Sequence, residues 1–527
     1  MKRSEQNNNA DLQQPINREQ FAMVAKTFQG LEDVLAEELR GIGAINVEPG
    51  RRMVAFEGDL EILYKANLCC RTALRILKPF LEFQASNADE LYDRTKDYDW
   101  SQLLNADKTF AIDTTVNSDE FTHSRFVTYR VKDAIVDWFK DRSSTGKRPG
   151  VRLQDADVMI NVHISGHNVT LSLDSSGESL HKRGYRVAQT EAPINEVLAA
   201  GIILKSGWRG DCPFVDPMCG SGTFLIEAAM IAANINPGIY RKGFAFEHWK
   251  DFDAELFDRL YNDDSNERPV NFPIIGADMS PKAVSIAERN IKGAGVAKYI
   301  QLEIKPLSQW TEAPANGVLI TNPPYGERIS VEDMDGLYEL IGEKLKHVFT
   351  GYHAWIIGYR DEYFAKIGLA PSVKLPLYNG ALECELREYI IFDGQMKDFK
   401  REGGTIRSHI VKEERPVRKD HGSFKERGGF SKERRGGFNK DKERGDFNGS
   451  KFKGGVDRYK PKGRRFADAK EESKPQSENP LAARRNEDAL RSIINRKPSL
   501  PPASGVVMRS RRGWKRPGAD NGSAEKE

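Results

Sequence analysis

The sequence has no long hydrophobic run and no cysteine pattern typical of a metal site. Its most apolar stretch, around Leu225–Ile235, is interrupted by Glu227, whereas a membrane-spanning helix needs about 18 or more apolar residues. The five cysteines are scattered without a CxxC pair, which argues against a zinc site and a disulfide framework. The first residues are polar, so we expect no secretory signal and no membrane partner. These absences favour a metal-free protein of the reducing cytoplasm.

Charge is distributed unevenly along the chain. The net charge of the 527 residues is only +3, yet residues 401–527 carry 34 basic and 19 acidic side chains. The preceding 400 residues therefore have a net charge of −12. The basic region repeats glycine, phenylalanine and charged residues and lacks the apolar residues for a core, so we expect residues 396–527 to be a disordered basic Gly/Phe-rich tail. Such a tail favours contact with RNA phosphates. The alternative is a solubilising tail without a fixed partner.

Hydrophobic periodicity predicts two α/β modules in the first third of the chain. Residues 1–20 lack this periodicity and are expected to form a disordered leader. Residues 21–87 read as strand, helix, strand, strand, helix, strand, the order of a ferredoxin-like domain. Residues 88–176 contain a predicted strand, an amphipathic helix and a hairpin that turns at Ser165-Gly166.

A short basic connector follows at residues 177–191. Its Arg183, Tyr185 and Arg186 either contact RNA or join the domains, and charge alone favours neither role.

From residue 192 to 395, apolar strands alternate with helices, which is typical of a doubly wound parallel sheet. The first strand leads through a glycine-rich loop into a helix, so a cofactor can approach the backbone closely. A dinucleotide fingerprint would need glycine at position 225, and no phosphate-binding GxxxxGK[ST] is present. The loop therefore favours a cofactor that offers an ammonium group over a purely structural turn. Its candidate cofactor-binding residues are Asp216, Pro217, Cys219, Gly220, Gly222 and Thr223.

A second acidic residue, Asp278, stands at the end of the next predicted strand, with Met279 beside it. An acidic side chain at this place can accept hydrogen bonds from ribose hydroxyls. Asp278 lies 62 positions after Asp216, against a usual spacing of about 20. We therefore expect an insertion at about 236–273. A helix N-cap is the alternative role of Asp278.

The third signal is the tetrad Asn322-Pro323-Pro324-Tyr325, which directly follows an apolar strand. An aromatic amine is a poor nucleophile because its lone pair is delocalised into the ring. If the Asn322 side-chain oxygen and the Pro323 carbonyl each accept one amine hydrogen, the nitrogen can aim its lone pair at a methyl group. Tyr325 can stack on a base turned out of its helix. The tetrad thus predicts amine methylation, with a structural Pro-Pro turn as the alternative.

In this order, DPMCGSGT, GADMS and TNPPYGER resemble the class I methyltransferases that modify amines. With DSSGESLHKRGYR and APINEVLAAGIIL added, about residues 20–395 are similar to the THUMP-containing guanine-N2-methyltransferases of bacterial 23S rRNA. The resemblance implies a ferredoxin-like piece and a THUMP RNA-binding module before a Rossmann-like catalytic domain. It further implies S-adenosylmethionine (SAM) as cofactor, with Asn322 contacting it, and 23S rRNA as partner. We favour a monomer.

One segment departs from the family pattern. The acidic residue that the family offers to the cofactor adenine is replaced by Ile304-Lys305-Pro306, so we expect backbone groups near Pro306 or Leu307 to serve instead. Three alternative functions remain: a tRNA guanine-N2-methyltransferase, an RNA-binding ribosome-assembly factor with an idle methyltransferase fold, and a DNA adenine methyltransferase. The THUMP-like module argues against the last.

Overall fold

The structure, a computed structural model, describes residues 19–394, except for residues 154, 191–192, 326–330, 381 and 393 and the side chains of 331–332. The predicted basic tail lies outside the described residues. So does the predicted leader, apart from residues 19 and 20.

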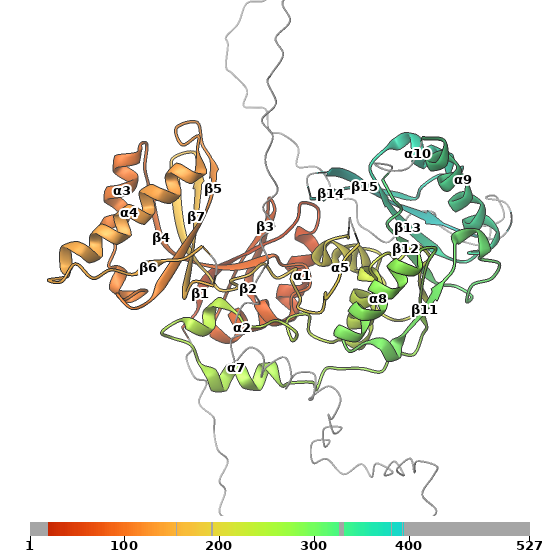
Figure 1. Cartoon of the computed structure of the whole chain (residues 1–527), viewed down its shortest axis with the longest axis horizontal. Helices are drawn as coiled ribbons and strands as arrows, with labels where there is room; N and C mark the ends of the chain where they lie inside the picture. The colour runs from red at the N-terminus through yellow and green to blue at the C-terminus, as the bar shows by residue number, and fades with distance from the viewer. Residues whose placement is uncertain are drawn as a thin grey trace, which may run out of the picture. The chain divides into compact units, whose positions relative to one another are not determined.

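The N-terminal modules build one continuous sheet (Figure 1). The ferredoxin-like part follows the predicted order: β1 (Phe21–Lys26), α1 (Glu32–Gly41), β2 (Ile45–Gly50), β3 (Met53–Gly58), α2 (Leu60–Cys69) and β4 (Arg75–Gln84). The second part consists of α3 (Ala88–Asp97), η1 (Trp100–Gln102), β5 (Thr109–Asn117), α4 (Ser124–Arg142), β6 (Gly150–Val151), β7 (Val158–Ser165) and β8 (Asn168–Asp174). The strand order is β2-β3-β1-β4-β8-β7-β5-β6. The modules therefore meet along β4 and β8, which pair antiparallel from Leu77↔Asp174 to Gln84↔Asn168.

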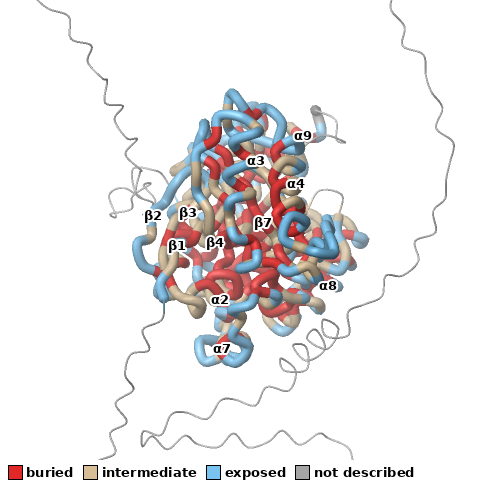
Figure 2. Tube along the Cα trace, turned by 90° about the vertical axis from the view of Figure 1, so that its left-hand side faces the viewer, coloured by how far each residue is buried: buried red, intermediate tan, exposed pale blue. Residues whose placement is uncertain are grey.

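The periodicity read from the sequence places the core as expected. Residues alternate between buried and half-buried along β3, and α4 buries one stripe that includes Val127, Val131 and Ile135. In Figure 2 buried positions accordingly lie along β7, most of whose residues are buried. The predicted hairpin turn is confirmed, since Gly166 has a φ of 58° directly after β7.

Residues after the connector form a second, seven-stranded sheet. Its elements are α5 (Glu196–Lys205), β9 (Phe214–Asp216), α6 (Thr223–Ala233), η2 (Ala245–His248), α7 (Ala254–Tyr261), β10 (Ile274–Asp278), α8 (Pro281–Gly293), η3 (Ala297–Tyr299), β11 (Ile300–Ile304), η4 (Leu307–Gln309), β12 (Val318–Thr321), α9 (Val331–His347), β13 (His353–Gly358), α10 (Asp361–Lys366), β14 (Val373–Asn379) and β15 (Leu382–Ile390). The order β11-β10-β9-β12-β13-β15-β14 is doubly wound. It reverses between β9 and β12, where ligands of such sheets bind.

The predicted insertion packs on the ferredoxin-like module. Phe246 stacks on Tyr64 of α2 with ring centroids 4.5 Å apart, and the Asp253 N–H donates to the Tyr64 hydroxyl over 2.9 Å. The Gly238 N–H donates to the Leu68 carbonyl over 3.0 Å. The insertion therefore links the second sheet to α2 of the ferredoxin-like module.

Within the described residues, no helix combines the length and apolar character that crossing a membrane requires.

Candidate active site

The glycine-rich loop lies where the sequence predicted it, between β9 and the first residue of α6, Thr223. Gly220 and Gly222 have positive φ angles of 53° and 81°. A Cβ on Gly222 would stand 3.1 Å from the Cβ of Ala287 on α8. Only glycine adopts such angles readily, so the tight turn and the close approach of α8 both depend on these residues.

Asp216 is buried at the base of the loop. Its Oδ1 accepts hydrogen bonds from the Thr321 hydroxyl over 2.9 Å and from the Met218 N–H over 3.2 Å. Burial raises the pKa of Asp216 to about 7, and the nearby Asp278 carboxylate adds to the increase, although both hydrogen bonds oppose it. A cation that binds beside Asp216 would therefore favour the ionised form of this carboxyl group.

Asp278 stands at the carboxyl end of β10, next to β9 in the sheet. Its two carboxylate oxygens accept from the Gly220 N–H over 3.0 Å and from the Ser280 N–H over 2.9 Å. Ser280, rather than Asp278, caps α8 by accepting from the Ala283 N–H. The alternative role of Asp278 as N-cap is therefore wrong, and its carboxylate instead braces the loop. Met279 beside it is largely exposed.

The tetrad follows β12 directly, as predicted. The Asn322 side-chain oxygen is buried and has no hydrogen-bond partner among the described residues. A buried amide oxygen without a partner is energetically unfavourable unless a ligand supplies a donor. Pro323 is buried and Pro324 exposed. The three acidic and amide side chains predicted for the site thus come from adjacent strand ends, β9, β10 and β12.

Tyr325 turns toward the β14–β15 hairpin. Its hydroxyl accepts from the Asn379 side-chain amide over 3.2 Å and lies 4.0 Å from the Cys384 Sγ. Its ring meets that of Tyr359 edge-on, with centroids 5.6 Å apart. Burial raises the pKa of Tyr325, so the phenol stays protonated.

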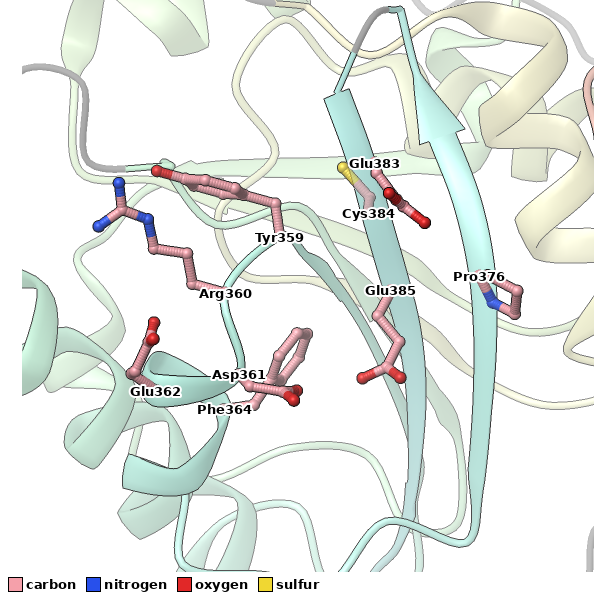
Figure 3. A pocket seen from close by; sticks show the side chains of 9 residues that line it. All are labelled: Tyr359, Arg360, Asp361, Glu362, Phe364, Pro376, Glu383, Cys384 and Glu385. Atoms are coloured by element: carbon pink, nitrogen blue, oxygen red, sulfur yellow. The ribbon is translucent and has the colours of Figure 1, made fainter.

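A cavity of about 430 Å³ adjoins Tyr325 through Tyr359 and Cys384. In Figure 3, Tyr359 and Arg360 leave the end of β13 on one side, and Cys384 and Glu383 stand on β15 on the other. The complete lining is Tyr359, Arg360, Asp361, Glu362, Phe364, Pro376, Glu383, Cys384 and Glu385. No motif in the sequence marks these residues, because only the pairing of β13 with β15 brings this cavity next to the tetrad.

The segment Ile304-Lys305-Pro306, which we expected near the cofactor adenine, is held by two contacts of Lys305. The Lys305 N–H donates to the Asp278 carbonyl over 3.0 Å, and the Lys305 ammonium lies 4.6 Å from the centroid of the Trp310 ring. Ile304 is 59% exposed at the end of β11.

Two side chains of the connector are buried against α6. The Arg183 guanidinium lies 3.5 Å from Glu227 of α6, and the Tyr185 hydroxyl donates to the same carboxylate over 2.9 Å. Both side chains are at most 2% exposed. Of the two roles left open for Arg183 and Tyr185, joining the domains is the one that the structure supports.

Three domain families match successive parts of this chain. They are an RlmL ferredoxin-like domain at residues 22–77, a THUMP domain at 85–174 and an RMKL-like methyltransferase domain at 183–388. A candidate RNA methyltransferase of Synechocystis sp., slr0064, is 38% identical over 378 residues, which are 71% of this chain and 97% of that protein. The chain belongs to the THUMP-containing, class I SAM-dependent RNA methyltransferases. The predicted family and fold class are confirmed.

Two longer proteins are similar to this chain over most of its length. The ribosomal RNA large subunit methyltransferase K/L of Syntrophotalea carbinolica is 40% identical over 377 residues, which are 69% of this chain and 52% of that protein. That of Desulfotalea psychrophila is 37% identical over 393 residues, 72% of this chain and 54% of that protein. The methyltransferase thus spans about half the length of these relatives.

A solved structure supports the cofactor. SMU.472, a candidate methyltransferase complexed with SAH, is 33% identical, with a TM-score of 0.64 and coverage of 72% of the methyltransferase and all of that chain. SAM is therefore the cofactor of this family, as predicted.

Proposed function

We propose that this protein transfers a methyl group from SAM to the exocyclic N2 amine of a guanine in large-subunit (23S) rRNA. The K/L relatives are named for large-subunit rRNA, and the THUMP domain favours an RNA substrate. The main support for amine methylation is the buried side-chain oxygen of Asn322, which has no partner among the described residues. An amine N–H could donate a hydrogen bond to it.

The tetrad is proposed to act by positioning. Asn322 Oδ1 and the Pro323 carbonyl accept the two amine hydrogens, and Pro324 keeps the turn rigid. The nitrogen lone pair then points away from the ring plane and toward the incoming methyl group. The N–C bond forms as the S–C bond breaks, and the amine loses one proton to solvent without a strong base at the nitrogen. Tyr325 packs against the flipped base, and the cavity behind Tyr359 provides room for its neighbouring atoms.

The loop is proposed to hold SAM. Asp216 faces its ammonium group, and Asp278 with Met279 takes the ribose. The backbone of Pro217, Cys219, Gly220, Gly222 and Thr223 approaches the rest of the molecule. Cys219 serves as a small buried residue here, because burial raises the pKa of its thiol well above the usual value and so disfavours a thiolate nucleophile.

Mass spectrometry of rRNA nucleosides from a strain that lacks this gene tests the proposal. We expect the loss of one N2-methylguanosine from 23S rRNA and its restoration by the wild-type gene but not by Asn322→Ala. A nucleoside profile that is unchanged by the deletion would contradict the proposal.

The same strains separate the alternatives. Methyl transfer to purified tRNA, with none to unmodified 23S rRNA, would establish a tRNA enzyme. Full rescue of every growth and assembly phenotype by Asn322→Ala would indicate an RNA-binding assembly factor whose fold is idle.

A further inference from the structure

Arg186 reaches from the connector to the cofactor loop. Its Nη1 donates to the Ser221 hydroxyl over 3.0 Å and its Nη2 to the Thr223 hydroxyl over 2.9 Å. On the other side, its Nε donates to the Glu196 carboxylate over 2.6 Å. The Arg186 side chain is 17% exposed and that of Glu196 is 7% exposed. One guanidinium therefore ties together the connector, the start of α5 and the junction of the loop with α6.

Asn290 of α8 fastens the next residues of the connector to the same loop. Its Oδ1 accepts from the N–H groups of Val187 and Ala188 over 3.0 and 3.1 Å. Its Nδ2 donates to the Ala188 carbonyl over 2.9 Å and to the Ser221 carbonyl over 3.0 Å. Asn290 is completely buried, and its bond to the Ser221 carbonyl is buried as well.

The connector consequently lies beside the glycine that turns the loop. A Cβ placed on Gly220 would stand 4.0 Å from the Thr190 hydroxyl. Because Arg186 bonds to two side chains of the loop, loop geometry depends on a residue outside the motif that defines it.

We propose that Arg186 is a positioning residue for SAM. From the connector, it holds residues 221–223 in the geometry that binds the cofactor, so the cofactor site is complete only when the connector is docked. The inference rests on the proposed role of the glycine-rich loop. Arg186 contacts neither of the proposed reacting groups, so its effect falls on cofactor affinity rather than on the methyl-transfer step.

The test compares SAM binding and turnover in the full-length protein. Arg186→Met keeps the aliphatic stem and removes all five donors. We expect the Kd for SAM, measured by calorimetry without RNA, and the KM for SAM to rise about tenfold. Arg186 acts through the loop, so only part of the stabilisation from its two lost charge-assisted bonds affects the cofactor. The kcat at saturating SAM should stay within about twofold.

Arg186→Lys should be intermediate, because a single ammonium can keep the ion pair with Glu196 but cannot also serve both hydroxyls. Lys182→Met is the matched control, since Lys182 lies in the same connector, is 57% exposed and forms a surface ion pair with Glu178. We expect it to leave the Kd and KM for SAM unchanged.

A double-mutant cycle distinguishes positioning from general destabilisation. Ser221→Ala removes one acceptor of Arg186 and should weaken SAM binding a fewfold in the wild-type background but hardly at all in Arg186→Met. Additive effects on the Kd, or a fall in kcat with an unchanged Kd, would overturn the inference. If Arg186→Met fails to fold, the same double-mutant cycle is measured with Arg186→Lys in its place.

Asp278→Asn separates this inference from the proposed cofactor site. If Asp278→Asn weakens SAM binding and Arg186→Met does not, only the role of Arg186 is refuted. If neither variant changes the Kd, the loop assignment itself is wrong.

Discussion

Binding of SAM should strengthen as the pH rises from 5.5 to 7.5, because the cofactor-free protein holds a proton on Asp216. The pKa of this buried carboxyl is about 7 against an ordinary value of 3.8. The proposed ammonium partner favours the ionised form, so binding releases the proton below pH 7. A peptide α-amino group has a pKa of about 7.7–8.0, so an ammonium of at least this basicity is mostly charged over this range.

The expected size follows from the two pKa values. If bound SAM returns the Asp216 pKa to about 4, the Kd falls about 25-fold between pH 5.5 and 7.5, which is ~1.9 kcal/mol. The dependence should flatten above pH 7. Removing the hydrogen bond from Thr321 with Thr321→Val should raise the pKa of Asp216 further and move this midpoint upward.

Calorimetry in buffers of different ionisation enthalpy measures both the affinity and the proton released. Asp216→Asn should bind weakly at every pH and lose the slope, whereas Asp278→Asn should bind weakly but keep it. A wild-type Kd that is flat across this range, with no proton released, would refute the assignment of Asp216 to the ammonium group.

Three further changes test other parts of the structure. Asn322→Ala should lower kcat at least about 100-fold in single-turnover kinetics, with little effect on the Kd for SAM, because it removes an acceptor that acts on the amine. A variant with the wild-type kcat would refute this role of Asn322. Gly184→Ala should lower the free energy of unfolding, measured by urea titration, by about 3 kcal/mol or more. Gly184 has a φ of 100°, and a Cβ at this position would clash with the Tyr240 carbonyl. Gly207→Ala is the control for backbone conformation alone, because Gly207 also has a positive φ but lies in open space. Deleting residues 401–527 should weaken RNA binding and flatten its salt dependence, with a modest effect on turnover at saturating RNA; equal salt slopes for the full-length and shortened proteins would contradict a role of the tail in RNA binding.

The sequence predicted most elements because their signals are local. Alternation along β3 and the apolar stripe of α4 appear within single segments. The loop, Asp278 and the tetrad were also visible, since each stands at the end of an apolar strand. Parallel pairing then brings them to one edge of the sheet. The roles proposed for these residues, and the boundaries at 87, 176 and 191, remain predictions.

Other features could not be predicted because they depend on contacts between distant segments. The basic residues of the connector did not distinguish RNA contact from joining the domains, and Arg183 is buried against Glu227, 44 positions away. Glu227 interrupts the otherwise apolar α6, but nothing in the sequence marks it as the partner of Arg183. The stacking of Phe246 on Tyr64 likewise joins parts of the chain that no local pattern connects.

The shared sheet of the two N-terminal modules has a consequence for dividing this protein. β4 pairs with β1 through Val24↔Leu77 to Lys26↔Arg75 and with β8 along most of its length, so it is an interior strand. A cut between residues 84 and 88 would convert β4 and β8 into open edges, which invite aggregation. We therefore expect amide hydrogens along this seam to exchange as slowly as those of the sheet interior. The boundary between the two modules in the sequence is therefore the place where we expect cutting the chain to be most destabilising.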